Sequence, residues 1–471
     1  MSDATPKPPA PTYAQLEELV SKLTAQVQLL TAKVAELEAK LKRNSTNSSQ
    51  PPSADPPWFQ RPPKPPTGRK PGGQPGHPGH FRQRLEPTRV HVYVPTQCAG
   101  CGHALPAAAG PRDPAPVCQQ VLELPRQPLD IIEHQSHART CPHCRRVTRQ
   151  PLPPDVKGRS VGPRLSAALA LLVAKGHVAR RFVVEWLRTV YGVPLSLGTV
   201  SACEAEVSAA LAQPYDALQE AVRHAPGAHM DETGWRCFQK QTWLWVVSTA
   251  RAVFYAVRPT RSSKELQALL GDLFVPRIVH SDRFGVYNGL PLEYRQLCWA
   301  HLIRDFARMV ELEGGAEVLG QRGLDLAAAI FDCWYRFRDG HIGRVELRVQ
   351  IQPLRAQLEA ALLEAQRNSP SSKARNFAGR IVRQYRALWT FVEREGVEPT
   401  NNEAERMLRT LVQWRKNSYG CHSLEGCQFA ERIMSVIQTL RKQSRDLLAY
   451  LTEALQAHRA GLAAPSILTS G

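Results

Sequence analysis

The chain of 471 residues lacks any apolar run of about 18 residues, the length that a membrane-spanning helix needs, so we expect no transmembrane helix. Its N-terminus, M-S-D-A-T-P-K-P-P-A-P, lacks the apolar region of a signal peptide. We therefore expect a cytoplasmic protein. Because structural disulfides are rare in that reducing compartment, the eleven cysteines are not expected to form them.

Three common catalytic signatures are also missing. The sequence has no G-x-x-x-x-G-K-[ST] phosphate-binding loop, no H-E-x-x-H zinc motif and no G-x-S-x-G nucleophile elbow. The chemistry that each of these motifs carries is therefore not indicated here.

Acidic residues are scarce relative to basic ones. The chain has 42 Asp and Glu against 60 Lys and Arg, a formal net charge of +18 and a pI near 9.7. This balance favours a polyanionic partner, most often nucleic acid; the alternative is a basic protein without that role. The hydrophobic content of 43% is enough for a sizeable core, and the length predicts roughly two to four domains.

Residues 13–43 show a helical pattern with two apolar positions in each heptad. Leucine occupies one position at Leu16, Leu23, Leu30 and Leu37, and the other holds Val20, Val27, Val34 and Leu41. β-branched residues at one position with leucine at the other favour a parallel two-stranded coiled coil. We therefore expect a homo-oligomer; the alternative is an amphipathic helix packed on its own chain.

Residues 44–89 predict a basic linker. The segment holds N-S-T-N-S-S-Q-P-P-S-A-D and, at Gly68–His80, G-R-K-P-G-G-Q-P-G-H-P-G-H, which is too rich in Pro and Gly to bury a core. One interpretation is a solvated linker. The other is a basic arm that lies along DNA phosphates or in a minor groove, and one segment can do both.

Residues 90–150 predict a small β-rich module that binds zinc. Short apolar runs at Val90–Val94 and Val121–Leu124 are typical of strands. Two C-x-x-C pairs can form two tight knuckles that complete a tetrahedral four-thiolate site. Such a closed site is structural, because no coordination position remains for a substrate. The predicted zinc ligands are Cys98, Cys101, Cys141 and Cys144.

Residues 160–225 are predicted to be helical and to bind DNA. The turn Tyr191-Gly192-Val193-Pro194 between two helical patterns resembles a helix-turn-helix, and a plain helical hairpin is an equal alternative.

From residue 226 the pattern changes to strands, with a helix at Lys264–Leu270. Strands are expected at Ala228–Asp231, Thr242–Ser248, Ala252–Val257 and Arg277–His280. Residues 302–395 are helical, and 396–460 hold further helices. This order predicts an α/β core at 226–301, a mixed sheet with helices on its faces, which is interrupted by a helical segment and then completed.

Three acidic residues lie in contexts typical of metal ligands: Asp231 in H-M-D-E-T-G-W-R, Asp282 in I-V-H-S-D-R-F-G, and Glu405 in T-N-N-E-A-E-R. Two-cation phosphodiester chemistry needs hard carboxylate ligands around ions that lie about 3.5–4 Å apart. Asp231 and the adjacent Glu232 face opposite sides of a strand, so only one of them can face the metals. Glu403 and Glu405 lie roughly 200° apart around a helix, so periodicity leaves that choice open as well.

Cys298-Trp299-Ala300-His301, with Arg304 and Asp305, forms a further polar cluster. His301 and Asp305 share one helical face. His301 could contact a phosphate, a water or a metal, and a structural role is an equal alternative.

Taken together, these motifs resemble those of transposases of the insertion sequence 66 family over nearly the whole chain. The shared elements are the leucine-rich helix, the N-S-T-N-S-S-Q-P-P-S-A-D and G-R-K-P-G-G-Q-P-G-H-P-G-H stretches and the C-x-x-C pairs with V-L-E-L-P between them. They continue with H-M-D-E-T-G-W-R, H-S-D-R-F-G-V-Y, C-W-A-H-L-I-R-D-F, T-N-N-E-A-E-R-M-L-R and S-V-I-Q-T-L.

The resemblance implies a DDE transposase with a ribonuclease H-like core, whose three metal ligands map to Asp231, Asp282 and Glu405. It implies Mg²⁺ or Mn²⁺ at that catalytic site, structural Zn²⁺ on the cysteine module, and a helical insertion between the second and third acids. The third motif of the family often begins D-N-N, and Thr400 stands at that position here.

We therefore expect a transposase of a bacterial mobile element that is associated with the nucleoid. It would bind double-stranded DNA at transposon ends and at the target, cleave the 3′ ends and transfer the strands. The resemblance also suggests small accessory proteins encoded beside it. The alternatives are a catalytically inactive DNA-binding regulator derived from a transposase, and a structure-specific nuclease on the same core.

Overall fold

The computed structural model describes residues 12–42, 44, 48, 55, 86–108, 118–121, 129–238, 240–273, 275–312 and 314–468. Most of the predicted basic linker lies outside the described residues, as does most of the apolar run at 121–124. The chain divides into two compact units, residues 60–131 and the rest, and each is described by itself. No helix among the described residues is long and apolar enough to cross a membrane.

The N-terminal helical pattern forms helix α1 (Tyr13–Leu41). Its seam residues are exposed along the helix, with Leu23 at 50% and Leu30 at 63% of full exposure.

The described part of the predicted β-rich module has little regular structure. The run Val90–Val94 is exposed and belongs to no strand, because no neighbouring strand covers either of its faces within the described residues. Two short antiparallel strands, β1 (Ala138–Thr140) and β2 (Val147–Arg149), flank the second cysteine pair. That pair therefore lies in the turn of a hairpin.

Four helices follow: α2 (Pro163–Ala174), α3 (Arg180–Tyr191), α4 (Leu197–Ala210) and α5 (Ala212–His224). Helix α3 ends where Gly192 adopts a left-handed conformation with φ 69°, a backbone geometry that glycine adopts without strain. Helix α4 begins after Ser196, whose hydroxyl accepts a hydrogen bond from the Thr199 N–H at 3.1 Å. The turn between α3 and α4 thus contains one residue that ends the first helix and a different residue that begins the second.

A five-stranded mixed sheet follows the helices, with strand order β5-β4-β3-β6-β7. The pairs β3–β4 and β4–β5 are antiparallel, whereas β3–β6 and β6–β7 are parallel. The strands are β3 (Gly227–Cys237), β4 (Lys240–Ser248), β5 (Val253–Arg258), β6 (Ile278–Ser281) and β7 (Arg295–Leu297). The prediction of a multidomain chain with a mixed sheet and helices is therefore confirmed.

Helices cover both faces of this sheet. Helix α5 packs on one face, where the Tyr215 and Phe254 rings lie 4.7 Å apart. The next residue of β5 points to the other face, and the Tyr255 hydroxyl donates to the Met407 carbonyl of α12 at 2.9 Å. The remaining core helices are α6 (Ser263–Leu270), α12 (Asn402–Ser418), α13 (Leu424–Lys442) and α14 (Leu447–Arg459).

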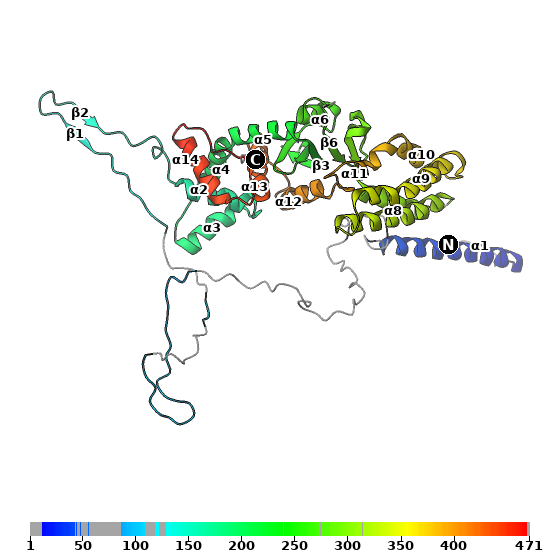
Figure 1. Cartoon of the computed structure of the whole chain (residues 1–471), viewed down its shortest axis with the longest axis horizontal. Helices are drawn as coiled ribbons and strands as arrows, with labels where there is room; N and C mark the ends of the chain where they lie inside the picture. Colours follow the sequence, from blue (N-terminus) through cyan, green and yellow to red (C-terminus); the bar gives the residue numbers. More distant parts are fainter. Residues whose placement is uncertain are drawn as a thin grey trace, which may run out of the picture. The chain divides into compact units, whose positions relative to one another are not determined.

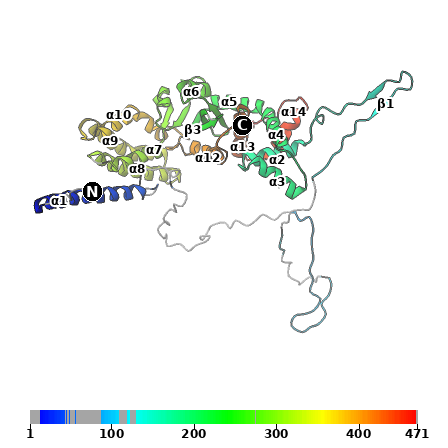
Figure 2. The same cartoon turned by 180° about the vertical axis from the view of Figure 1, so that it is seen from behind.

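A helical insertion separates β7 from α12 and has a hydrophobic core of its own, built around Trp299, Phe306 and Trp389. It comprises α7 (Trp299–Val310), α8 (Ala316–Arg338), α9 (Arg344–Asn368), α10 (Ser372–Arg383) and α11 (Thr390–Glu393). Short 3₁₀ helices lie at Gly285–Gly289, Leu292–Tyr294 and Tyr385–Leu388. Helices α8, α9 and α10 gather at one end of the sheet, and α2, α3, α4 and α14 at the other (Figure 1, Figure 2).

Candidate active site

The first predicted ligand, Asp231, lies within strand β3. One of its carboxylate oxygens accepts a hydrogen bond from the Glu232 N–H at 2.8 Å. Burial raises the pKa of Asp231 well above its ordinary value, and the charges of Glu232, Asp282 and Glu405 raise it further. Asp282 and Glu405 therefore both lie close enough to Asp231 for their charges to act on it.

The second predicted ligand, Asp282, directly follows the last residue of strand β6. Its carboxylate accepts a hydrogen bond from the Phe284 N–H at 2.9 Å, and its backbone carbonyl accepts one from Arg295 at 2.8 Å. These two bonds hold the turn after β6 in a fixed conformation.

A stacked pair of histidines lies on the adjacent strands β3 and β6, close to these acids. His229 and His280 are partners in the parallel β3–β6 register, and their rings stack with centroids 3.8 Å apart and planes 13° apart. Each histidine precedes one of the aspartates by two residues, so all four side chains share one face of the sheet. Burial lowers the pKa of His229 to about 4 and that of His280 to about 3, so both rings are neutral at pH 7.

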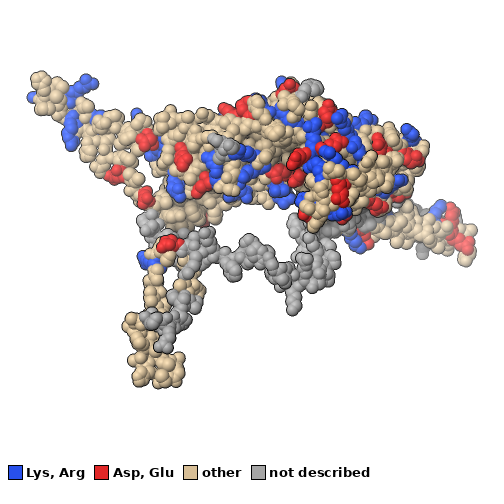
Figure 3. Space-filling view, viewed as in Figure 1, with Lys and Arg blue, Asp and Glu red and all other residues tan. Residues whose placement is uncertain are grey.

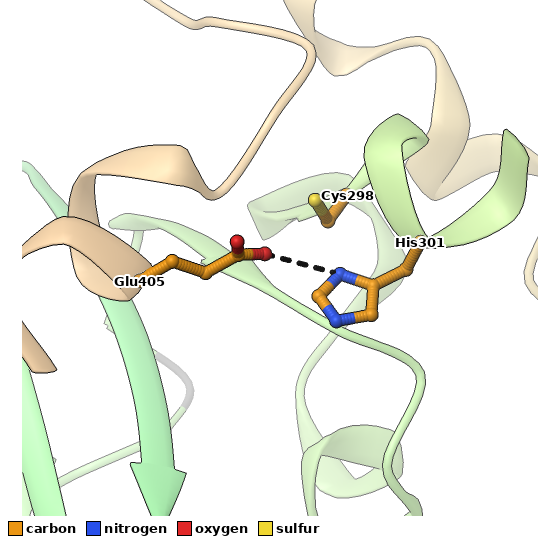
Figure 4. Close-up of side chains that lie close together, drawn as sticks. All are labelled: Cys298, His301 and Glu405. Carbon is orange, nitrogen blue, oxygen red and sulfur yellow. Dashed lines mark ion pairs between the residues drawn. The ribbon is translucent and has the colours of Figure 1, made fainter. Parts of the chain in front are cut away.

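The third predicted ligand, Glu405, lies in the first turn of α12. One of its oxygens lies 3.6 Å from His301 Nδ1 and 3.7 Å from an Arg304 guanidinium nitrogen. That oxygen is buried and has no hydrogen-bond partner among the described groups. The carboxylate and the His301 ring face one another, with Cys298 beside them (Figure 4).

Asn401 ties the start of α12 to the rest of the site and is fully buried. Its side-chain amide donates to the Met230 carbonyl at 2.6 Å, and its side-chain oxygen lies 3.2 Å from His229 Nδ1. Its backbone N–H donates to Cys298 Sγ at 3.2 Å. One residue thus joins β3, the start of α7 and the helix that carries Glu405.

The two acids that the sequence left as alternatives have different surroundings. Glu232 accepts hydrogen bonds from Arg261 at 2.7 Å and from the Tyr287 hydroxyl at 2.6 Å. Glu403 lies 2.7 Å from the Lys442 ammonium group. Burial opposes ionisation of Glu403, but the bond and charge of Lys442 outweigh it and lower the pKa. Among the described residues, no Lys or Arg forms an ion pair with Asp231, by contrast.

Cys298, His301 and Glu405 together offer donor atoms that lie within 4.8 Å of one another. Sulfur, imidazole nitrogen and carboxylate oxygen are a donor set that Zn²⁺ accepts, whereas Mg²⁺ prefers oxygen alone. Burial raises the pKa of the Cys298 thiol. The site therefore holds a softer group of donors beside its carboxylates.

Each predicted cysteine knuckle has the same backbone arrangement. The N–H of Gly102 donates to the Cys98 carbonyl at 2.8 Å, and the N–H of Arg145 donates to the Cys141 carbonyl at 2.9 Å. Gly102 and Arg145 both have positive φ, 74° and 60°. Backbone N–H groups of Cys101 and Cys144 lower the pKa of Cys98 and Cys141 respectively. Both knuckles therefore favour the thiolate form that binds metal.

Sequence reasoning missed the roles of His229, His280, Arg261 and Tyr287, which lie behind or beside the acids. The signal for the histidines was present, because each stands two residues before an acid at a strand end. The contacts of Arg261 and Tyr287 with Glu232 join residues 29 and 55 positions apart, and no local pattern predicts them.

Comparison with known proteins follows the same motifs. Residues 158–429 match a family model described as the transposase IS66 family, and residues 4–83 match a family of unknown function. The uncharacterized protein y4hP of Sinorhizobium fredii (strain NBRC 101917 / NGR234) is 24% identical over 420 residues, which cover 79% of this chain and 72% of that protein. The uncharacterized protein y4jD of the same strain is 24% identical over 300 residues, covering 56% of this chain and 57% of that protein.

Proposed function

The chain belongs to the transposase IS66 family, and from that premise we propose that it is a DNA transposase that cleaves the 3′ ends of its element and transfers them to target DNA. The single observation that carries the catalytic part is that the charges of Asp282 and Glu405, which come from separate segments, both raise the pKa of Asp231. Asp231 forms no ion pair with Lys or Arg among the described residues, so its ionised form is costly, and a bound metal would relieve that cost.

The sheet supports a ribonuclease H-like core. Three antiparallel strands are followed by two parallel ones, with Asp231 in the central strand β3 and Asp282 directly after the neighbouring strand β6. The 122 residues between Asp282 and Glu405 contain the helical insertion. Such a core would hold the first two acids rigidly, while α12 brings the third.

The residues present fit Mg²⁺ or Mn²⁺, since Asp231, Asp282 and Glu405 offer carboxylate oxygens and one Glu405 oxygen has no hydrogen-bond partner among the described groups. When bound, such ions activate the attacking water or 3′-hydroxyl and stabilise charge on the leaving oxygen. Asn401 would orient the helix that carries Glu405. The Arg304 guanidinium, 3.7 Å from Glu405, would hold a phosphate of the scissile strand.

The remaining parts fit the holding of DNA ends. Four thiolates at Cys98, Cys101, Cys141 and Cys144 would bind Zn²⁺ as a structural ion, which agrees with the lowered pKa of Cys98 and Cys141. The basic linker and helices α3 and α4 would contact duplex DNA, and α1 would pair two chains so that two ends are processed together.

The first prediction tests the three acids. Asp231→Asn, Asp282→Asn and Glu405→Gln should each abolish Mg²⁺-dependent nicking of labelled duplex that carries the element's ends, while leaving end binding intact. Each should also lose the rise in Tm that Mg²⁺ gives the wild type, because a metal ligand is missing. Glu403→Gln is the matched control and should keep both properties.

Any one acid variant that nicks at near wild-type rate would show that its residue is not a ligand. Products in which the wild type has joined a cleaved end to target DNA would indicate a transposase, whereas cleavage without joining would indicate a nuclease. End binding without any nicking by the wild type would indicate an inactive regulator.

A further inference from the structure

Helix α10 carries a positively charged face that the catalytic proposal does not use. Lys373, Arg380 and Arg383 are exposed on it, whereas Phe377 and Ile381 are buried. The sequence of α10, S-K-A-R-N-F-A-G-R-I-V-R, contains no acidic residue. Lys and Arg side chains gather on the face of the molecule that carries α10 (Figure 3).

Two adjacent cavities open along this face. The larger, of about 1030 Å³, is lined by Arg308 of α7 and by Lys373, Arg375, Arg380 and Arg383 of α10, with Glu311 as the one acid among its described lining residues. The smaller, of about 290 Å³, shares Arg380 and Arg383 and adds Arg283, Asn288 and Gln384. Because two arginines line both cavities, the two form one continuous basic trench.

Two of the residues that line the trench connect it to the candidate active site. Arg283 directly follows Asp282 and forms an ion pair with Asp305 of α7. Arg308, which lines the larger cavity, lies seven residues after His301 on the same helix, or about 10 Å along its axis. One residue of the smaller cavity, Arg283, is thus next in sequence to Asp282, and one residue of the larger cavity, Arg308, lies on the helix that carries His301.

Most of the trench cations are not neutralised by the protein. Within the described residues, Lys373, Arg380 and Arg383 form no ion pair, and the lining contains six Lys and Arg against one acid. Uncompensated cations this close together favour an anionic ligand with several charges.

We infer that this trench binds the sugar-phosphate backbone of a single DNA strand next to the cleavage site, an inference that rests on the proposed function. The 290 Å³ end is at the lower limit of small-ligand sites, roughly 300 Å³, so it takes one strand and not a duplex. None of the described residues that line the two cavities is aromatic, so we expect no stacking of bases on aromatic rings there and binding that is independent of base identity. The insertion thus holds a strand that is separated from its complement as the end is cut.

The experiment uses full-length protein and fluorescein-labelled dT20, dA20 and the dA20·dT20 duplex, with Kd measured over a salt series. Arg380→Gln/Arg383→Gln should weaken binding of both single strands roughly 25-fold at 0.1 M salt and reduce the salt slope by about 1.4, because two phosphate contacts are lost. Lys264→Gln/Arg322→Gln, which removes two exposed cations from outside the trench, is the control with the same net charge. Duplex binding should fall equally in both variants.

Arg380→Lys/Arg383→Lys keeps the charges and should stay within about threefold of the wild type, which separates loss of charge from loss of folding. Equal losses of single-strand affinity in the trench and control variants would overturn the inference, as would a wild type that binds no single strand. Neither readout depends on nicking. A protein that binds single strands in the trench but never nicks element ends would refute only the proposed function.

Discussion

Asn401 is the residue on which the geometry of the candidate site depends most. Its side chain bonds to β3 at Met230 and His229, and its backbone bonds to Cys298, while Glu405 lies one turn further along α12. A buried amide with these partners fixes the direction in which α12 begins. Under the proposed function, we expect Asn401 to position Glu405 and not to touch the reacting atoms.

The second prediction concerns this residue. Asn401→Ala should lower the free energy of unfolding by about 1–3 kcal/mol, because the buried Met230 carbonyl loses its donor. It should also lower the nicking rate and raise the Mg²⁺ concentration needed for half-maximal rate, since Glu405 is no longer held. Denaturant unfolding and a Mg²⁺ titration of nicking measure these effects.

Asn402→Ala is the control, because Asn402 is the exposed first residue of α12. A variant at Asn401 that loses stability but keeps its Mg²⁺ dependence would show that the residue is structural alone.

At the residue scale the sequence was sufficient to propose Asp231, Asp282 and Glu405, because each lies in a recognisable motif. Periodicity could not choose between Glu403 and Glu405. Their different partners, Lys442 for one and His301 with Arg304 for the other, come from segments about 40 and 100 residues away that only the fold brings near. The stacked histidines depend on the register of two strands, which the sequence does not specify.

At the scale of elements, α13 protects the exposed edge of the sheet. Strand β5 is an edge strand, and its N–H groups at Val253 and Tyr255 donate to Thr439 and Ser435, both at 2.9 Å, while the Val257 N–H donates to Glu431. The three acceptors recur every four residues, so they form one row along the helix. The side chains of α13 thus take the hydrogen-bonding place of a sixth strand. They protect this edge of the sheet from pairing with a strand of another chain.

The third prediction follows from the carboxylate in this row. Burial raises the pKa of Glu431 to about 7, so the folded protein holds a proton that the unfolded chain releases above its ordinary pKa of 4.5. The stabilisation is therefore complete below about pH 4.5 and is lost as the pH rises through 7, up to about 3 kcal/mol. Glu431→Gln, which keeps an acceptor for Val257, should remove that loss.

Urea unfolding from pH 5 to pH 8 measures this prediction. Ser435→Ala is the comparison, because it removes an uncharged acceptor and should destabilise by a similar amount at every pH. A Glu431→Gln variant with the wild-type pH dependence would contradict the assignment.

Much of the element order was predictable, because the apolar runs of β3, β4, β5 and β6 and the helix α6 are distinct in the sequence. Strand β7 was not predicted, because Arg295 and Gln296 are polar yet fully buried. Arg295 is accommodated by Ser281 and the Asp282 carbonyl, and the Gln296 side chain by backbone groups. From sequence alone, polar residues such as these are expected to be exposed, because the hydrogen bonds that allow their burial are visible only in the fold.

At the scale of the whole molecule, α1 presents an apolar seam with no cover among the described residues. Leu30 belongs to the seam, whereas the adjacent Leu29 lies off it, and the two are similarly exposed at 63% and 71%. Replacing either leucine with aspartate therefore gives two variants of identical composition, which differ only in whether the change lies in the seam.

The fourth prediction is that Leu30→Asp dissociates the oligomer and Leu29→Asp does not, because a charge is costly only inside a coiled-coil seam. Sedimentation or light scattering of the full-length protein measures the mass. An unchanged mass for both variants would favour the alternative in which α1 packs on its own chain.

The position of Glu405 after the helical insertion also has a consequence for synthesis. A ribosome completes both aspartates and the whole insertion before it adds the last acid, 123 residues after Asp282. A chain ended early by a frameshift in that interval would keep the predicted coiled-coil helix and the cysteine pairs but only two of the three carboxylates, and it would lack α12, α13 and α14, which pack on the sheet. Under the proposed function such a fragment could not assemble the acidic site, so premature termination would leave the gene with an inactive product.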